Sequence, residues 1–201
     1  LYNRFFGDPW ANEYLLFEPG VHQPSLILPF LPGHLWAFTG GPHGAWEREA
    51  AWAALDFAPS TGTGGCEPST DWAVAAAAGL VVRNESGVVV LDLDGDGREQ
   101  TGWTLIYLHI ATRGSVEIGT LVEAGDRIGH PSCEGGVATG THLHLVRKYN
   151  GEWILADGPL PFNLSGWVAH AGANAYEGTL TREGETVIAC PCSSQETFIR
   201  R

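Results

Sequence analysis

The sequence predicts a mainly β protein, an antiparallel β-sheet or sandwich with little helix. Turn-forming residues are abundant, with 27 glycines and 12 prolines in 201 residues, and 44% of the residues are hydrophobic. This mix suits a globular, turn-rich β protein better than a helical bundle. In addition, the apolar segments Val88–Leu93 and Gly102–Ala111 flank the turn-forming run Asp94–Gly97, which is the pattern of a β-hairpin.

Turn residues separate the other predicted strands in chain order. Pro32 and Gly33 divide the first strand from the second, and the third ends before Pro59. Gly40–Gly44 is predicted to be a loop and Glu47–Ala54 to contain a turn of helix. Together with the hairpin, the predicted strands are Ser25–Phe30, His34–Phe38, Ala54–Phe57, Ala73–Arg83, Leu121–Val122, Arg127–Gly129, His142–Tyr149, Glu152–Leu155, Trp167–His170 and Thr179–Ala189.

The segment Ala73–Arg83 is the most ambiguous of these. Its four consecutive alanines favour a helix by propensity. However, the segment is short, Gly79 interrupts it, and it continues into the β-forming run Leu80–Val82. We therefore predict a strand.

Length and charge restrict the organisation and the partners of the chain. We expect an N-terminal arm (1–24), a β domain (25–170) and a C-terminal extension (171–201) packed on that domain, in a monomer. The formal net charge of −12 argues against a nucleic-acid partner. The longest apolar run, Trp72–Val82, is shorter than the roughly 20 residues of a membrane span. The chain starts at Leu1 and contains no Met, so we expect a processed or excised piece without its signal or anchor.

Four cysteines allow three disulfide connectivities. Cys66 and Cys133 both lie near segments with candidate site residues, so we favour this pair, which leaves Cys190 and Cys192 to form a tight ring. The alternative is four reduced, buried thiols in a cytosolic protein. A cysteine-rich zinc site is disfavoured because the chain has no Cys-x-x-Cys motif.

The pair His142 and His144 is the most informative feature of the sequence. In a strand, alternate side chains point to the same face, so both imidazoles project together. Two such histidines can share one metal, or one can bind a metal while the other transfers a proton.

Three other residues stand in positions that suggest a site. His43 lies in the glycine-rich segment Gly40–Gly44, and His109 follows the apolar segment Leu105–Leu108. Asp56 is a single carboxylate in an apolar strand, where it needs a cation, a metal or hydrogen-bond donors. Taken singly, a histidine in a strand is more often a hydrogen-bonded core residue than a ligand, and Asp56 could be a structural strand-end cap. The ordered set is what favours a site.

In this order, the segments resemble the motifs of the lysostaphin-type (LytM-like) zinc metallopeptidases, a family of peptidoglycan endopeptidases. The matching residues here are His43 with Asp56, then Tyr107–His109, then Gly140–His144. Ala124–Gly129 is also similar to the glycine-containing segment that precedes the last motif in that family.

The resemblance implies a role for each residue. His43, Asp56 and His144 would bind Zn²⁺, and three protein ligands leave a fourth tetrahedral position for water. His109 and His142 would be the catalytic pair that transfers protons and supports the developing oxyanion. One spacing differs from the family, where the Asp usually follows the His by four residues, whereas here it follows by 13.

The resemblance further implies a zinc endopeptidase that cleaves peptide bonds in peptidoglycan cross-links or stem peptides, by means of zinc-activated water and two assisting histidines. It implies a substrate groove over the antiparallel sheet and a secreted protein in the cell envelope or outside the cell. One alternative is a non-catalytic wall-binding or hydrolase-activating module of the same fold.

Two other metal-binding patterns are disfavoured. A cupin-like site expects a Glu four or five residues after the His-x-His pair, where this chain has Lys148 and Tyr149. Asp92–Gly97 resembles the start of a calcium loop, but the twelfth position holds Trp103 instead of Glu, so we expect a polar turn.

Overall fold

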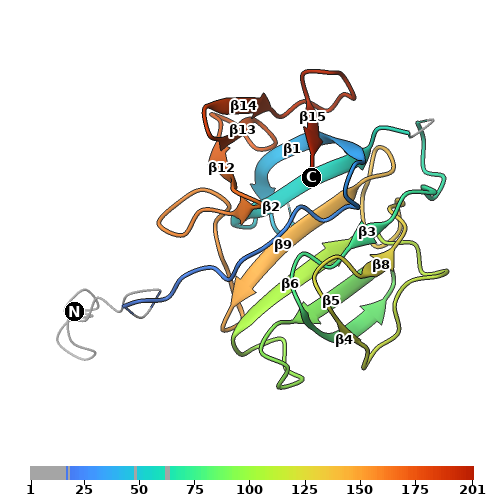
Figure 1. Cartoon of the computed structure of the whole chain (residues 1–201), viewed down its shortest axis with the longest axis vertical. Coiled ribbons are helices and arrows are strands. Elements are labelled where there is room, and N and C mark those ends of the chain that lie inside the picture. Colours follow the sequence, from blue (N-terminus) through green and yellow to red (C-terminus); the bar gives the residue numbers. More distant parts are fainter. Residues whose placement is uncertain (1–16, 18, 48, 62–63) are drawn as a thin grey trace, which may run out of the picture.

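The computed structural model describes residues 17, 19–47, 49–61 and 64–201 (Figure 1). The described part of the chain contains strands and turns and no helix, which confirms the predicted mainly β class. Within that part, there is accordingly no helix that could cross a membrane. The strands are β1 (Leu35–Gly44), β2 (Trp52–Pro59), β3 (Ala73–Val74), β4 (Gly79–Glu85), β5 (Val88–Asp92), β6 (Trp103–Leu108), β7 (Leu121–Val122), β8 (Arg127–Gly129), β9 (Leu143–Tyr149), β10 (Glu152–Trp153), β11 (Asn163–Leu164), β12 (Trp167–Ala171), β13 (Gly178–Arg182), β14 (Glu185–Ile188) and β15 (Phe198–Arg200).

A nine-stranded sheet forms the centre of the molecule. Its order is β15-β1-β2-β9-β6-β5-β4-β7, and β10 pairs with β9 at one end. All of these pairings are antiparallel. A four-stranded sheet of β11 to β14 lies beside β1, and β3 pairs with β8 (Figure 1).

The two faces of the central sheet are packed differently because alternate side chains of a strand point to opposite sides. On β6, Leu105 and Tyr107 belong to the large main core, whereas Ile106 and Leu108 belong to a smaller cluster rich in alanine and valine. Asp56 stands between two main-core residues of β2, so its carboxylate points to the side of the smaller cluster. The main core thus supports the sheet from one face, and polar residues can gather on the other.

Several local predictions were wrong. Gly40–Gly44 is the end of β1, because its backbone pairs with β2 through a series of register shifts. The described residues of 47–51 form turns instead of helix, and β2 begins at Trp52. In Ser25–Phe30 only Phe30 makes a bridge, and the alanine-rich segment 73–83 is divided between β3 and β4.

At the C-terminal side, the predicted strand 179–189 is the hairpin of β13 and β14. The short strands β11 and β15 were not predicted. Each has only two or three residues, too few to show an alternating pattern, and the partner of β15 also lies far away in the sequence.

Candidate metal centre and active site

Three adjacent strands bring His43, Asp56 and His144 together. In the β2–β9 pair, Asp56 lies directly opposite His144. In the β1–β2 pair, Gly40 lies opposite Asp56, and His43 follows on the same hairpin. The 13-residue separation of His43 and Asp56 therefore reflects a hairpin whose two arms return to the same place, and no close sequence spacing is needed.

The three side chains present one atom each to a common centre. His43 Nε2 lies 3.0 Å from His144 Nδ1 and 3.3 Å from Asp56 Oδ1, and His144 Nδ1 lies 3.1 Å from that same oxygen. All three residues are buried, with 2 to 6% of their surface exposed. They form one of two groups of possible metal ligands among the described residues.

Backbone carbonyls determine which ring nitrogen of each histidine is free. His43 Nδ1 lies 2.8 Å from the Gly41 carbonyl, and His144 Nε2 lies 3.0 Å from the Ala45 carbonyl. A carbonyl only accepts, so these nitrogens carry the protons. The lone pairs of His43 Nε2 and His144 Nδ1 then face each other and the Asp56 carboxylate, an arrangement that is repulsive unless a cation lies between them.

The donor set fits zinc. A tetrahedral ion with bonds of about 2.0–2.1 Å holds its ligand atoms about 3.3 Å apart, close to the separations found here. Two imidazoles and one carboxylate are ordinary zinc ligands, and three ligands are typical of catalytic sites. His43, Asp56 and His144 would therefore hold the ion, with their orientation set by the Gly41 and Ala45 carbonyls.

The pKa shifts of Asp56 and His43 in the metal-free protein also favour the binding of a cation. Burial alone would raise the pKa of Asp56, but the charges and hydrogen bonds of His43 and His144 lower it well below its usual value. Burial alone would lower the pKa of His43, but Asp56 and the Gly41 carbonyl raise it on balance. The centre is thus a buried negative group that attracts a cation.

His109 and His142 lie beside this centre, with ring centroids 4.5 Å apart. His142 Nε2 is 3.7 Å from Asp56 Oδ1. His142 Nδ1 donates to the Gly140 carbonyl over 2.7 Å, and His109 Nδ1 donates to the Glu134 carbonyl over 2.8 Å. In their neutral forms both rings thus keep the lone pair of Nε2 available.

His109 is neutral over a wide pH range. Burial, followed by the proximity of His142, lowers its pKa to about 4. A neutral imidazole with a free nitrogen can accept a proton near neutral pH. The structure therefore brings all five residues singled out in the sequence into one cluster.

A groove of about 500 Å³ extends from this cluster. Its lining includes Asp56 and His142 of the cluster, and Gly65 and Glu67. Tyr176 also lines the groove, and its ring stacks on His43 with centroids 4.1 Å apart. Sequence reasoning missed Tyr176, which stands alone in a polar segment with no motif around it.

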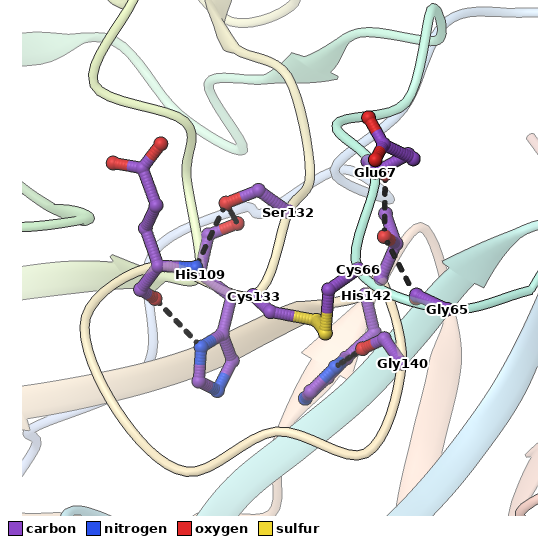
Figure 2. The surroundings of a disulfide bond; sticks show 10 residues. Gly65, Cys66, Glu67, His109, Ser132, Cys133, Gly140 and His142 are labelled. Atoms are coloured by element: carbon purple, nitrogen blue, oxygen red, sulfur yellow. Dashed lines mark hydrogen bonds between the residues drawn. A yellow bond between two sulfur atoms is a disulfide. The ribbon is translucent and has the colours of Figure 1, made fainter.

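The predicted pairing of the cysteines is confirmed. Cys66 bonds to Cys133, across 67 residues, and Cys190 bonds to Cys192. The Cys66–Cys133 bridge lies between His109 and His142 in the view of Figure 2.

The second group of possible metal ligands is Asp92, Asp94 and Asp96. These carboxylates accept backbone N–H groups within residues 94–98, which agrees with the expected polar turn.

Comparison with known proteins finds relatives in sequence and in fold. No protein-family model matches the chain. The chain is 25% identical over 158 residues to the beta-lytic metalloendopeptidase of Lysobacter enzymogenes, a match that covers 78% of this chain and 85% of that protein. The enzyme of the same name from Achromobacter lyticus is 26% identical over 164 residues, covering 78% of this chain and 41% of that protein.

Among solved structures, the M23 metalloprotease pseudoalterin, described as coming from the deep sea, has the same fold. It superposes with a TM-score of 0.66 at 23% identity, over 83% of this chain and 96% of that one. The chain is therefore similar in sequence to two metalloendopeptidases, which together with the His-Asp-His centre supports a metallopeptidase, and it has the fold of an M23 metalloprotease.

Proposed function

We propose that the protein is a zinc-dependent endopeptidase that cleaves peptide bonds in peptidoglycan cross-links or stem peptides. The observation that carries this proposal is the convergence of His43 Nε2, Asp56 Oδ1 and His144 Nδ1 beside a second pair of histidines. The choice of peptidoglycan rests on the resemblance of the motifs to lysostaphin-type enzymes. The groove next to the centre is suited to an extended peptide.

Each residue has a distinct role in this mechanism. His43, Asp56 and His144 would hold the metal, which would polarise the scissile carbonyl and make water a stronger nucleophile at neutral pH. His109 and His142 are fixed by carbonyls at Nδ1, so each presents Nε2 to the reacting groups. There one ring would take a proton from the nucleophile at Nε2 and give it to the leaving amine, and the other, when protonated at Nε2, would donate to the developing oxyanion.

We also propose that the protein works in the cell envelope or outside the cell. Two disulfides account for all four cysteines, which favours an oxidising compartment.

The division of the chain into an arm, a β domain and a C-terminal extension remains a proposal. It is supported by β15, which adds to the edge of the central sheet, and by Gln23, whose side-chain amide donates to the Asn163 carbonyl over 2.7 Å. Most of the proposed arm, residues 1–16 and 18, lies outside the described residues. A monomer stays a prediction.

The test combines metal analysis with mass spectrometry of digested peptidoglycan. We expect about one zinc per chain and peptide fragments with new amino termini. His144→Ala should lose both zinc and activity, because it removes a ligand. His109→Ala should keep most of the zinc and lose about 10²-fold or more in kcat, the scale of a proton-transfer group.

His22→Ala is the matched control, since His22 is exposed and bonds to the nearby Gly20 carbonyl, and it should behave as the wild type. A wild-type protein that takes up no zinc, and is not stabilised by added zinc, would contradict the enzyme proposal. Zinc uptake and wall binding without cleavage would favour the non-catalytic module.

A further inference from the structure

The Cys66–Cys133 disulfide joins two segments that hold the two histidines proposed to be catalytic. Cys133 lies in the segment Ser132–Glu134, which contacts His109. Cys66 lies in the segment Gly65–Glu67, which contacts the residue before His142. Both segments are shown with the bridge in Figure 2.

His109 depends on the first segment for its geometry. It lies just past the end of β6, with a φ of +65°, a left-handed conformation that is uncommon for residues other than glycine. The Ser132 backbone N–H and its Oγ both donate to the His109 carbonyl, over 2.6 and 3.1 Å. The Glu134 carbonyl accepts from the His109 ring over 2.8 Å. Backbone and ring are thus both held by the residues on either side of Cys133.

His142 depends on both segments. The backbone N–H of Thr141 donates to the Gly65 carbonyl over 2.9 Å, and its Oγ1 donates to the Glu67 carbonyl over 2.6 Å. From the other side, the His142 N–H donates to the Ser132 carbonyl over 3.3 Å. The backbone that carries His142 is therefore bracketed by the two segments that the disulfide joins.

We infer that the Cys66–Cys133 disulfide, together with Ser132, is a positioning device that sets His109 and His142 relative to each other. This inference rests on the proposed function, in which these two rings act on the same substrate. The two segments are far apart in the sequence, and both lie outside the named strands. A covalent link between them restricts the relative movement of the two backbones, and catalysis is sensitive to displacements of about 1 Å.

A positioning role and a purely stabilising role predict different effects of removing the disulfide. A disulfide that only stabilised the fold would change the melting temperature and leave the kcat of the folded enzyme unchanged. A positioning role lowers kcat at temperatures where the protein is fully folded. It leaves KM and zinc content near their wild-type values, because the three metal ligands are held by β1, β2 and β9.

The test is the double variant Cys66→Ala/Cys133→Ala, assayed well below its melting temperature. We expect kcat to fall about 10- to 100-fold, with zinc content and KM nearly unchanged. Ser132→Ala, which keeps the disulfide and removes one of the two bonds to the His109 carbonyl, should lower kcat in the same sense. Ser165→Ala is its control, because that hydroxyl accepts from the Leu28 N–H, on a different part of the chain.

A second readout does not depend on activity. Long-range ¹H–¹⁵N spectra of the histidine side chains should show the signals of His109 and His142 shifted or split in the double variant, while those of His22 and His170 stay in place. If the wild type cleaves no peptide, the proposed function fails and these spectra alone test the positioning.

Several results would overturn the inference. Wild-type kcat with unchanged histidine spectra would do so, and so would a higher KM at constant kcat, which would mean that the bridge shapes the groove. If the double variant does not fold, Ser132→Ala provides the test instead. A wild-type kcat in Ser132→Ala would then rule out the positioning role.

Discussion

His109 combines an uncommon backbone conformation with a side chain that resists protonation. Its left-handed φ turns the ring out of the line of β6, and its carbonyl and Nδ1 are both bonded to the segment 132–134. Burial keeps its pKa near 4. These properties suit a proton acceptor, since the ring is neutral at the pH where hydrolysis must occur.

The lowered pKa of His109 makes stability depend on pH in a defined window. The unfolded chain protonates this ring near pH 6.5 and the folded protein only near pH 4. Its stabilising contribution is therefore present above pH 6.5 and is lost as the pH falls toward 4. As the pH of the metal-free proteins falls through this window, the free energy of unfolding should fall less for His109→Gln than for the wild type. The difference should reach up to about 3 kcal/mol.

Urea unfolding of both proteins at pH 4, 5, 6 and 7 measures this difference, because the other titrating groups are common to both. Parallel stability curves across the window would show that His109 titrates normally.

At the scale of elements, the β1–β2 hairpin determines the metal centre. Its arms approach so closely that a Cβ added to Gly40 would lie 2.7 Å from Asp56 Oδ2 and 3.0 Å from Asp56 Cβ. The absence of a side chain at Gly40 is what lets the carboxylate occupy its place opposite His144. This explains why a glycine-rich run that looked like a loop in the sequence is a strand in the structure.

Gly40→Ala should therefore weaken the metal centre. The new methyl group must displace the Asp56 carboxylate, so zinc affinity should fall about tenfold or more, the scale of disturbing a group next to a ligand. Isothermal titration with zinc measures the affinity, and circular dichroism reports whether the fold is kept.

The control is Gly79→Ala, which also adds a methyl group where there is no room, 2.5 Å from the Asp92 carbonyl. It should lower the melting temperature and leave zinc affinity unchanged. Equal zinc affinities for the two variants would contradict the close-approach explanation.

At the scale of the whole molecule, a buried arginine connects the central sheet to the later part of the chain. Arg147 of β9 is fully buried, and its guanidinium donates to the carbonyls of Leu155, Leu160 and Pro161 and to the side-chain oxygen of Gln23. It also lies over the Phe162 ring, 4.7 Å from its centroid. A single side chain thus satisfies several polar atoms where separate segments meet.

Arg147→Met should lower the free energy of unfolding by at least about 2 kcal/mol, because it leaves buried carbonyls without a donor. Arg83→Met is the comparison, since the ion pair of Arg83 with Glu99 is partly exposed and should contribute at most about 1 kcal/mol. Urea unfolding at neutral pH measures both. A loss for Arg147→Met no larger than that for Arg83→Met would show that water replaces the lost donors.

Much of this protein is encoded locally. Alternation, glycine and proline indicated the antiparallel class and most of the longer strands, because side-chain period and turn chemistry are properties of neighbouring residues. The order of the motifs singled out His43, Asp56, His109, His142 and His144, and their proximity to cysteine segments favoured the Cys66–Cys133 bridge.

Contacts between distant segments could not be predicted from the order of residues. Asp56 pairs with His144, and the rings of His109 and His144 donate to the carbonyls of Glu134 and Ala45. Ser132 in turn donates to the His109 carbonyl. Each of these contacts joins residues that lie far apart in the sequence. The strand β15, which pairs with β1, and Tyr176, which stacks on His43, were missed for the same reason. Such contacts depend on how the sheet closes and on which side chains are buried together, so only the tertiary structure decides them.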